Sequence, residues 1–256
     1  MAIITISKQI GSLGLEVAEA VADRLGYKLI DKSQISEALS KHGFSSSDID
    51  HYDEKKPSLL QHLSLKIKVF EHLIRASVYK LAAGDNVVIV GRGGQIILKD
   101  IPGTLRVRII APDTTRVKRI KEKTGCDDKN ALWALQQSDQ NSSGYIHTYF
   151  NADWNDSMLY DLILNTQTMP FSTCVEMIIT AAENDEFSIN PQVAEELNDL
   201  ALTQKVLAVL LEFDEVGRGD LVVKNRQVFL SESLPLEVKD MCRKALSKIE
   251  GIREIK

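Results

Sequence analysis

Two glycine-containing stretches of the sequence carry the residue types best suited to hold phosphate. The first is residues 7–14, SKQIGSLG, which lies between an apolar run and a helical pattern. A loop of this kind directs backbone N–H groups to one point at a helix N-terminus, where the helix dipole favours an anion. Phosphate is the natural ligand of such a loop. The alternative is that Gly11 and Gly14 only form a tight turn. The common phosphate-loop pattern GxxxxGK[ST] is not met.

The second stretch is residues 91–94, GRGG, which follows the β-branched run VVIV at residues 87–90. Ligands of open α/β sheets bind outside the carboxyl ends of the strands. The guanidinium of Arg92 would offer forked, permanently charged donors that match a phosphate. The alternative is that Arg92 pairs with a structural carboxylate.

Short apolar runs that alternate with helical patterns must position these two stretches. Strands are predicted at residues 2–6, 28–30, 87–90, 105–110 and 160–165, and helices at 17–25, 31–39, 58–83, 114–123 and 174–183. This alternation predicts a doubly wound parallel sheet that is covered by helices on both faces. The long helix at 58–83 is expected to cover the core rather than form a dimer interface. No element is assigned to the polar stretch at 124–159.

The last 65 or so residues change character. Their pattern predicts a helix, two strands around an Asn225-Arg226 turn, a second helix and a closing strand, at residues 197–211, 220–224, 227–231, 236–249 and 252–255. This α-β-β-α-β order differs from the preceding alternation and indicates a small α+β domain. A linker is expected near residues 184–191, so the predicted domains are 1–187 and 195–256.

Composition excludes several classes of protein. The 256 residues carry a formal charge of −5, which argues against a nucleic-acid partner held by a broad basic surface. Cys126, Cys174 and Cys242 lie far apart, without metal-ligand or disulfide spacing. No secretion signal and no run of 18 apolar residues is found, so a cytoplasmic protein outside the membrane is expected.

Four segments of the sequence together resemble one protein family. ITISKQIGSLGLEVAEAVADRLGYKLIDKSQI, VIVGRGGQIIL, RVRIIAPDTTRVKRI and DWNDSMLYDLILNT resemble, in the family's order, segments of the cytidylate-kinase-like proteins. These form a branch of the nucleoside monophosphate kinases, which have the P-loop fold. The resemblance covers residues 1 to about 180. It implies phosphoryl transfer from ATP, with Mg²⁺, to a nucleoside monophosphate such as CMP or dCMP.

The resemblance also implies roles for individual residues. Gly11, Ser12 and Gly14 would cradle the donor phosphates, and Lys8 would replace the lysine that the loop lacks. Arg92 would hold the acceptor monophosphate.

For three further residues the resemblance implies a location but does not fix a role. Asp31 falls near the acceptor region. Arg116 and Arg119 lie on a helix that could turn them toward the phosphates or toward solvent.

The sequence departs from the family's pattern in ways that bear on catalysis. Leu13 replaces a glycine, and Glu16 stands where a hydroxyl would ligate Mg²⁺. The lid stretch at 139–142, DQNS, lacks both expected cations. His147, in an expected polar loop of the same region, would be either one donor or a surface residue. One alternative is therefore a catalytically impaired nucleotide-binding regulatory protein, and another is a scaffold that binds no nucleotide.

Residues 200–256 resemble a BON-type domain, through KNRQVFLS at 224–231 and GIREI at 251–255. Glu232 stands where that family has glycine. BON-type domains are associated with binding and with membrane or envelope contacts, so the resemblance implies an interaction module whose partner is unknown. The alternative is a small appendage that supports a homodimer.

Overall fold

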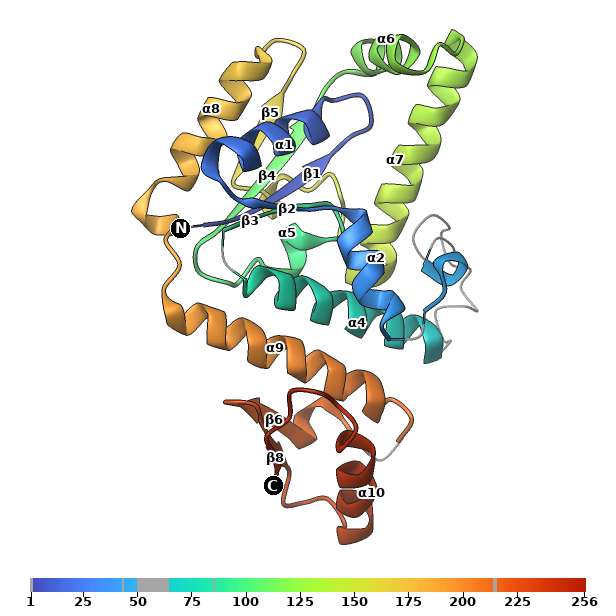
Figure 1. Cartoon of the computed structure of the whole chain (residues 1–256). Helices are drawn as coiled ribbons and strands as arrows, with labels where there is room; N and C mark the ends of the chain where they lie inside the picture. The colour runs from blue at the N-terminus through green and yellow to red at the C-terminus, as the bar shows by residue number, and fades with distance from the viewer. Residues whose placement is uncertain (1, 43, 50–64, 85, 214–215) are drawn as a thin grey trace.

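The fold is built on a five-stranded parallel sheet. A computed structural model of the chain describes residues 2–42, 44–49, 65–84, 86–213 and 216–256. The strands are β1 (Ile3–Lys8), β2 (Lys28–Ile30), β3 (Val87–Val90), β4 (Thr104–Ile110) and β5 (Leu162–Asn165). They pair in the order β2-β3-β1-β4-β5, and every ladder is parallel (Figure 1). The doubly wound parallel sheet expected from the sequence is thereby confirmed.

Helices cover both faces of this sheet. The elements around it are α1 (Gly14–Leu25), α2 (Lys32–Ser40), α4 (Leu65–Ala82), α5 (Gly94–Ile97), α6 (Asp113–Thr124), α7 (Asp128–Phe150), η2 (Ser157–Leu159) and α8 (Phe171–Ala182). Strand β3 is buried throughout, and its side chains alternate between two hydrophobic cores, one under α1 and α8 and one under α4. A continuous apolar run is what a strand buried on both faces requires.

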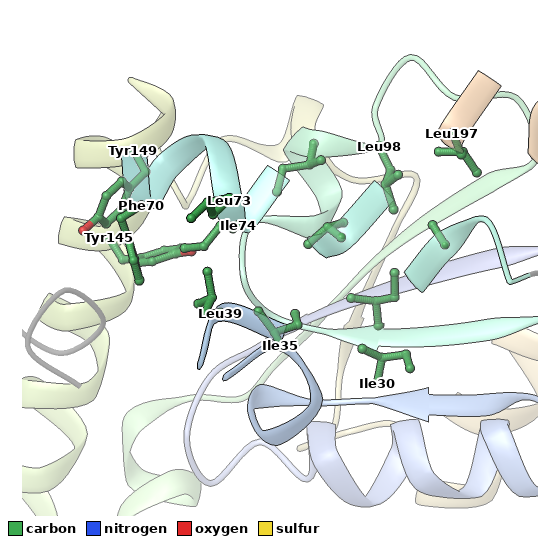
Figure 2. Close-up of a cluster of buried hydrophobic side chains, with 14 of the residues drawn as sticks. Ile30, Ile35, Leu39, Phe70, Leu73, Ile74, Leu98, Tyr145, Tyr149 and Leu197 are labelled. Carbon is green, nitrogen blue, oxygen red and sulfur yellow. The ribbon is translucent and has the colours of Figure 1, made fainter. Parts of the chain in front are cut away.

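Helix α4 covers the core, as expected, with Phe70 and Ile74 fully buried (Figure 2). Its predicted first residues, 58–64, lie outside the described part of the chain. Cys174 and Cys242 are buried thiols, and Cys126 is partly exposed. Within the described residues, no helix is both long and apolar enough to cross a membrane.

The main departure from the predicted elements is α7. Residues 128–150 form a single helix where the sequence pattern indicated only a polar stretch. Its buried side chains lie near its two ends, at Ala131 and Leu135 and again from Gly144 to Tyr149, and polar residues occupy the middle. The apolar period is therefore interrupted over several turns, which hides the helix from a periodicity analysis.

Helix α9 (Pro191–Leu210) begins earlier than predicted, inside the expected linker. The Asn190 side chain accepts a hydrogen bond from the Val193 N–H, and Pro191 opens the helix, which is a favourable N-terminal arrangement. The helix lies along α4 (Figure 1). Leu197 belongs to the core under α4, whereas Leu210 belongs to the C-terminal core. Because α9 serves both cores, the boundary between residues 187 and 195 stays a prediction.

The C-terminal unit has the predicted α-β-β-α-β order. After η3 (Asp185–Phe187) and α9 come η4 (Arg218–Asp220), β6 (Leu221–Lys224), β7 (Gln227–Leu230), α10 (Leu236–Leu246) and β8 (Glu254–Ile255). Strands β6 and β7 form an antiparallel hairpin, and β8 pairs with β7 in parallel. Asn225 and Arg226 have φ of 52° and 64°, as a two-residue type I′ turn needs.

Candidate functional site

Two clefts open at the carboxyl edge of the sheet and meet at Lys8. The first, of about 660 Å³, lies between the sheet edge and α7 and includes Asp31, Arg92 and Tyr145 in its wall. The second, of about 610 Å³, lies between residues 9–16 and α6. Lys8, the last residue of β1, lines both clefts. Of the predicted site residues, the structure therefore places Asp31 and Arg92 around one cleft and Gly11, Gly14 and Arg119 around the other.

The N-terminus of α1 has the features of an anion site. Leu13 occupies the N-cap position with φ of 63° and makes no side-chain capping bond. The first bond back into the helix runs from the Val17 N–H to the Leu13 carbonyl oxygen. The N–H groups of the first turn therefore lack a capping side chain at the second cleft, where the positive end of the helix dipole lies.

The two glycines of this loop are required by close packing. A Cβ at Gly11, where φ is 74°, would lie 2.9 Å from the carbonyl oxygen of Arg116. A Cβ at Gly14 would lie 2.5 Å from the Cβ of Lys8. Packing alone therefore accounts for both glycines, and it also brings the loop backbone close to Lys8.

Ser12 is turned away from both clefts. Its side chain is fully buried, and its hydroxyl donates to the carbonyl oxygen of Gln9 at 2.7 Å. Its own carbonyl oxygen accepts a 2.8 Å hydrogen bond from the Thr166 hydroxyl. The hydroxyl group of Ser12 is thus used to shape the loop, and only its backbone remains for the predicted phosphate role.

Lys8 is partly withdrawn from solvent between two other charges. Burial lowers the pKa of its ammonium group below the usual value; Glu16 opposes this shift and Lys123 adds to it. Lys123 pairs with Glu16 at 3.3 Å and lines the second cleft. The sequence analysis missed Lys123, although its position four residues after Arg119 on one helix places both on the same face.

Arg119 contacts the loop and lines the second cleft, as the sequence suggested it could. Its guanidinium donates to the Thr166 hydroxyl at 2.8 Å, to the Thr166 carbonyl oxygen at 2.8 Å and to the Gly11 carbonyl oxygen at 3.3 Å. These bonds hold the guanidinium plane at the cleft wall, where a planar cation can stack on or hydrogen-bond to a ligand.

Arg116 does not face either cleft. Its side chain is 1% exposed and forms ion pairs with Asp139 at 2.6 Å and with Asp113 at 2.9 Å. It also reaches the Ile10 carbonyl oxygen at 3.4 Å, behind the loop. Arg116 therefore links α6, α7 and the loop. The sequence suggested that its side chain points toward phosphates or toward solvent, and the structure shows neither orientation. Asp139, expected in the lid, is its partner.

The turn after β3 presents Arg92 in a constrained backbone. Gly91, Arg92 and Gly93 are consecutive left-handed residues, with φ of 74°, 56° and 71°. A Cβ at Gly93 would lie 2.3 Å from the ring of Phe150, so α7 packs directly on this turn. A non-glycine residue in this region costs about 1–3 kcal/mol, and such strain is concentrated at functional sites.

Asp31 lies on the same wall as Arg92. Its carboxylate caps α2 by accepting 2.7 Å hydrogen bonds from the Ser33 N–H and the Ser33 hydroxyl. These hydrogen bonds lower the pKa of Asp31, the hydroxyl bond contributing most, and the charge of Arg92 adds to the effect. Asp31 is therefore ionised beside Arg92 at neutral pH, with part of its hydrogen-bonding capacity already in use.

The face of α7 that lines the first cleft is uncharged. Trp133, Gln137, Asn141 and Tyr145 contribute to it, and the described cations around this cleft are Lys8, Lys32 and Arg92. The lid cations missing from the sequence are thus not replaced from elsewhere on α7. His147 is exposed and lies on this helix, not in the polar loop expected. Trp133, 63% exposed, was not singled out from the sequence.

A buried arginine supports the floor of the first cleft. Arg108 on β4 is 4% exposed and stacks on Trp154, with 4.3 Å from its guanidinium carbon to the ring centre. It donates to the Trp154 carbonyl oxygen and to the Asn155 side chain, and Trp154 in turn donates to the Ser7 hydroxyl at 2.9 Å. This cluster, also missed from the sequence, holds Ser7 and Trp154 in place at the cleft.

Comparisons with known proteins identify relatives of this chain. Residues 3–168 match the model of the cytidylate kinase-like family. A cytidylate kinase from Archaeoglobus fulgidus is 26% identical over 189 residues, which cover 73% of this chain and 98% of that protein. The solved structure of an uncharacterized protein from Eubacterium ventriosum aligns with a TM-score of 0.55 at 26% identity, over 71% of this chain and 98% of that one.

One further similar protein is an isomerase and not a kinase. A uronate isomerase from Corynebacterium glutamicum is 30% identical over 98 residues, which cover 38% of this chain and 19% of the isomerase. The present chain thus spans only about a fifth of that relative's length.

Proposed function

The chain belongs to the cytidylate kinase-like family, and we propose that it transfers a phosphoryl group from ATP to a nucleoside monophosphate, CMP or dCMP. The observation that carries this proposal is the position of Lys8. It ends the central strand and lines both clefts, so a donor in one cleft and an acceptor in the other would meet at its ammonium group.

The second cleft is suited to the donor. The N–H groups at the start of α1 would bind the ATP phosphates, because they lack a capping side chain and lie at the positive end of the helix. Arg119 and Lys123 would add charge along the same cleft, and Ile10, Leu13 and Ile120 provide apolar wall for the base.

The first cleft is suited to the acceptor. Arg92 would bind the monophosphate through its forked N–H groups, which match two phosphate oxygens at once. Asp31, ionised and beside Arg92, would keep the guanidinium oriented or accept from a hydroxyl or amino group of the nucleotide.

Catalysis in this arrangement rests on positioning and on charge. Phosphoryl transfer needs little covalent help, so aligning the two phosphates and neutralising the developing charge supplies most of the rate. Lys8 would stabilise the transferring group. Glu16 and Glu122 line the donor cleft, and Mg²⁺ is usually held by one or two carboxylates together with phosphate oxygens. Glu16, which replaces the expected hydroxyl, would hold the ion with Glu122 by exchanging its ion pair with Lys123 for it. When bound, the ion would neutralise phosphate charge.

The proposal is tested by a coupled assay with ATP, Mg²⁺ and a panel of nucleoside monophosphates. We expect ADP to form with CMP or dCMP. An arginine that closes on the transferring group is typically worth a factor of about 10³ or more, so turnover without the lid cations should be slow. Absence of transfer to every monophosphate would overturn the proposal. Calorimetric binding of nucleotides without any turnover would instead support an impaired, regulatory protein.

We further infer that residues 195–256 act as a BON-like interaction module. The α-β-β-α-β order and the hairpin support this inference. Val222 and Phe229, cross-strand neighbours on β6 and β7, are 60% and 36% exposed and form an outward apolar pair. If the module pairs two copies of the chain, Val222→Ser with Phe229→Ser should convert a dimer to a monomer in sedimentation velocity. A sedimentation profile unchanged by both substitutions would contradict self-association through this face.

A further inference from the structure

Tyr145 holds a buried hydroxyl group at the wall of the acceptor cleft. It lies on the cleft-lining face of α7, and its side chain is only 9% exposed. Its hydroxyl oxygen is fully buried; the Arg92 guanidinium is close enough to act on this oxygen, and no described atom accepts the hydroxyl proton. Buried polar groups in native proteins almost always have a partner, so an unsatisfied one next to a cleft points to a ligand.

The ring of Tyr145 is held rigidly. Its centre lies 4.9 Å from that of Tyr149 and 5.9 Å from that of Phe150. Tyr149 in turn packs on Phe70 of α4, at 5.7 Å (Figure 2). The hydroxyl position is therefore set by aromatic packing between two helices, and it does not depend on a flexible loop.

The guanidinium of Arg92, next to Tyr145, determines whether the oxygen or the proton of the Tyr145 hydroxyl can bind a ligand. Burial raises the pKa of Tyr145 to about 12, and the charges of Arg92 and Arg75 and the interaction of the Arg92 side chain with the hydroxyl oppose that shift. The phenol is therefore protonated at neutral pH. A guanidinium has donors only, so Arg92 can use only a lone pair of the phenolic oxygen. The O–H proton has no acceptor among the described atoms, and Tyr145 lines the first cleft.

The aromatic packing around Tyr145 also holds the turn that carries Arg92. Phe150, which contacts the Tyr145 ring, lies directly over Gly93, where a Cβ would come within 2.3 Å of it. Tyr145 and the turn that bears Arg92 are thus fixed by one shared aromatic residue. One charged and one neutral donor residue, Arg92 and Tyr145, therefore both line the first cleft.

We propose that Tyr145 is a second ligand of the acceptor, donating its O–H to an oxygen of the 5′-phosphate that Arg92 binds. The inference rests on the proposed function for the identity of the nucleotide, but the chemistry requires only a phosphate monoester in the first cleft. Tyr145 binds the acceptor and takes no part in bond making or breaking.

The test compares Tyr145→Phe with Tyr149→Phe by calorimetry, using CMP, cytidine and ATP as probes. Both substitutions remove only a hydroxyl, and Tyr149, 3% exposed, is on the same helix and in the same cluster. A hydrogen bond to a charged group corresponds to roughly a ten-fold or larger change in affinity. We expect Tyr145→Phe to weaken CMP binding about ten-fold and to leave cytidine and ATP binding unchanged, and Tyr149→Phe to change none of them.

The outcomes separate this inference from the proposed function. Equal CMP affinity in the two variants, or an equal loss for cytidine and CMP in Tyr145→Phe, would overturn the role of Tyr145 at the phosphate. If the unmodified protein binds no nucleoside monophosphate, the proposed function is wrong, and inorganic phosphate decides the role of Tyr145. Weaker phosphate binding in Tyr145→Phe than in Tyr149→Phe would support the role of Tyr145 as a phosphate ligand. Equal or undetectable phosphate binding in the two variants would contradict that role.

Discussion

The two strand-to-helix turns at the carboxyl edge of the sheet differ in how they can hold a phosphate. The turn after β1 offers backbone N–H groups, because its one hydroxyl, on Ser12, is turned inward and its cations come from Lys8 and α6. The turn after β3 carries its own cation, Arg92, on a left-handed backbone. A row of backbone donors suits a polyphosphate chain, whereas one forked side chain suits a single terminal phosphate.

The comparison also separates a buried, paired arginine from one that lines a cleft. Arg116 lies behind the first turn, buried between two carboxylates, and Arg92 lies at the surface of the first cleft. Charge alone therefore does not identify a phosphate ligand in this protein.

The largest expected effect is on stability, at the ion pair behind the first turn. Asp139→Ala leaves the buried Arg116 guanidinium with Asp113 as its remaining carboxylate partner. Removal of one partner of a buried pair typically costs 3–5 kcal/mol, and we expect about 3 kcal/mol because Asp139 is partly exposed. Urea unfolding measures this loss. Lys118→Ala, at an exposed position of α6, is the control, and equal free energies of unfolding for the two variants would contradict the structural role of Arg116.

The next effect is specific to the acceptor. Arg92→Ala removes the forked donors of the second turn and should weaken CMP binding by about 100-fold, since a charge-assisted bidentate contact is worth several kcal/mol. ATP affinity should stay within a factor of about two, since it depends on the other turn. Calorimetry with both nucleotides checks this. A parallel loss of ATP affinity would remove the distinction between the turns.

The matching change in the first turn should affect the donor. Gly14→Ala places a methyl group against Lys8, where only 2.5 Å is available. Overpacking of this kind costs about 1–3 kcal/mol, which corresponds to roughly a 30-fold loss of ATP affinity if the loop must shift. Gly219→Ala, where a Cβ meets no atom within 4 Å, is the control. Unchanged ATP binding in Gly14→Ala would show that the loop backbone does not hold the donor.

The smallest expected effect is a pH dependence carried by Lys8. Burial lowers the pKa of this lysine, so it loses its charge at a lower pH than an exposed lysine does. ATP affinity should therefore fall by roughly a few-fold while Lys8 deprotonates, in a pH range below that in which an exposed lysine titrates. Lys8→Arg, whose side chain remains charged, should abolish the fall. The same alkaline loss in Lys8→Arg would assign the titration to another group.

The sequence predicted much of the fold because its strands are short, apolar and well separated by turn residues. Strands β2 and β3 have the predicted bounds, and the Asn225-Arg226 turn joins β6 to β7 as expected. The sequence did not predict α7, because packing at its two ends stabilises it and its middle is polar. It also did not reveal that α9 serves two cores.

The candidate site was predicted in position but less well in detail. Glycines after two strands indicated where the clefts would lie, because parallel strands end at one edge of the sheet. The partners of the charged residues depend on tertiary contacts. Arg116 pairs with Asp139, 23 residues away, and Lys123 pairs with Glu16, 107 residues away. No local pattern contains such pairings, so the pairing of Arg116 could not be predicted from spacing, whereas for Lys123 spacing indicated only that it shares a helix face with Arg119.

The central claim, that the two clefts form one reaction centre at Lys8, is tested most directly by binding of a bisubstrate ligand. Such a ligand joins adenosine and cytidine through a 5′-to-5′ polyphosphate chain. We predict one ligand per chain, an affinity about 100-fold or more above that of ATP or CMP alone, and a loss of that gain in both Arg92→Ala and Gly14→Ala. Binding no tighter than that of ATP, and insensitive to Arg92→Ala, would contradict the account.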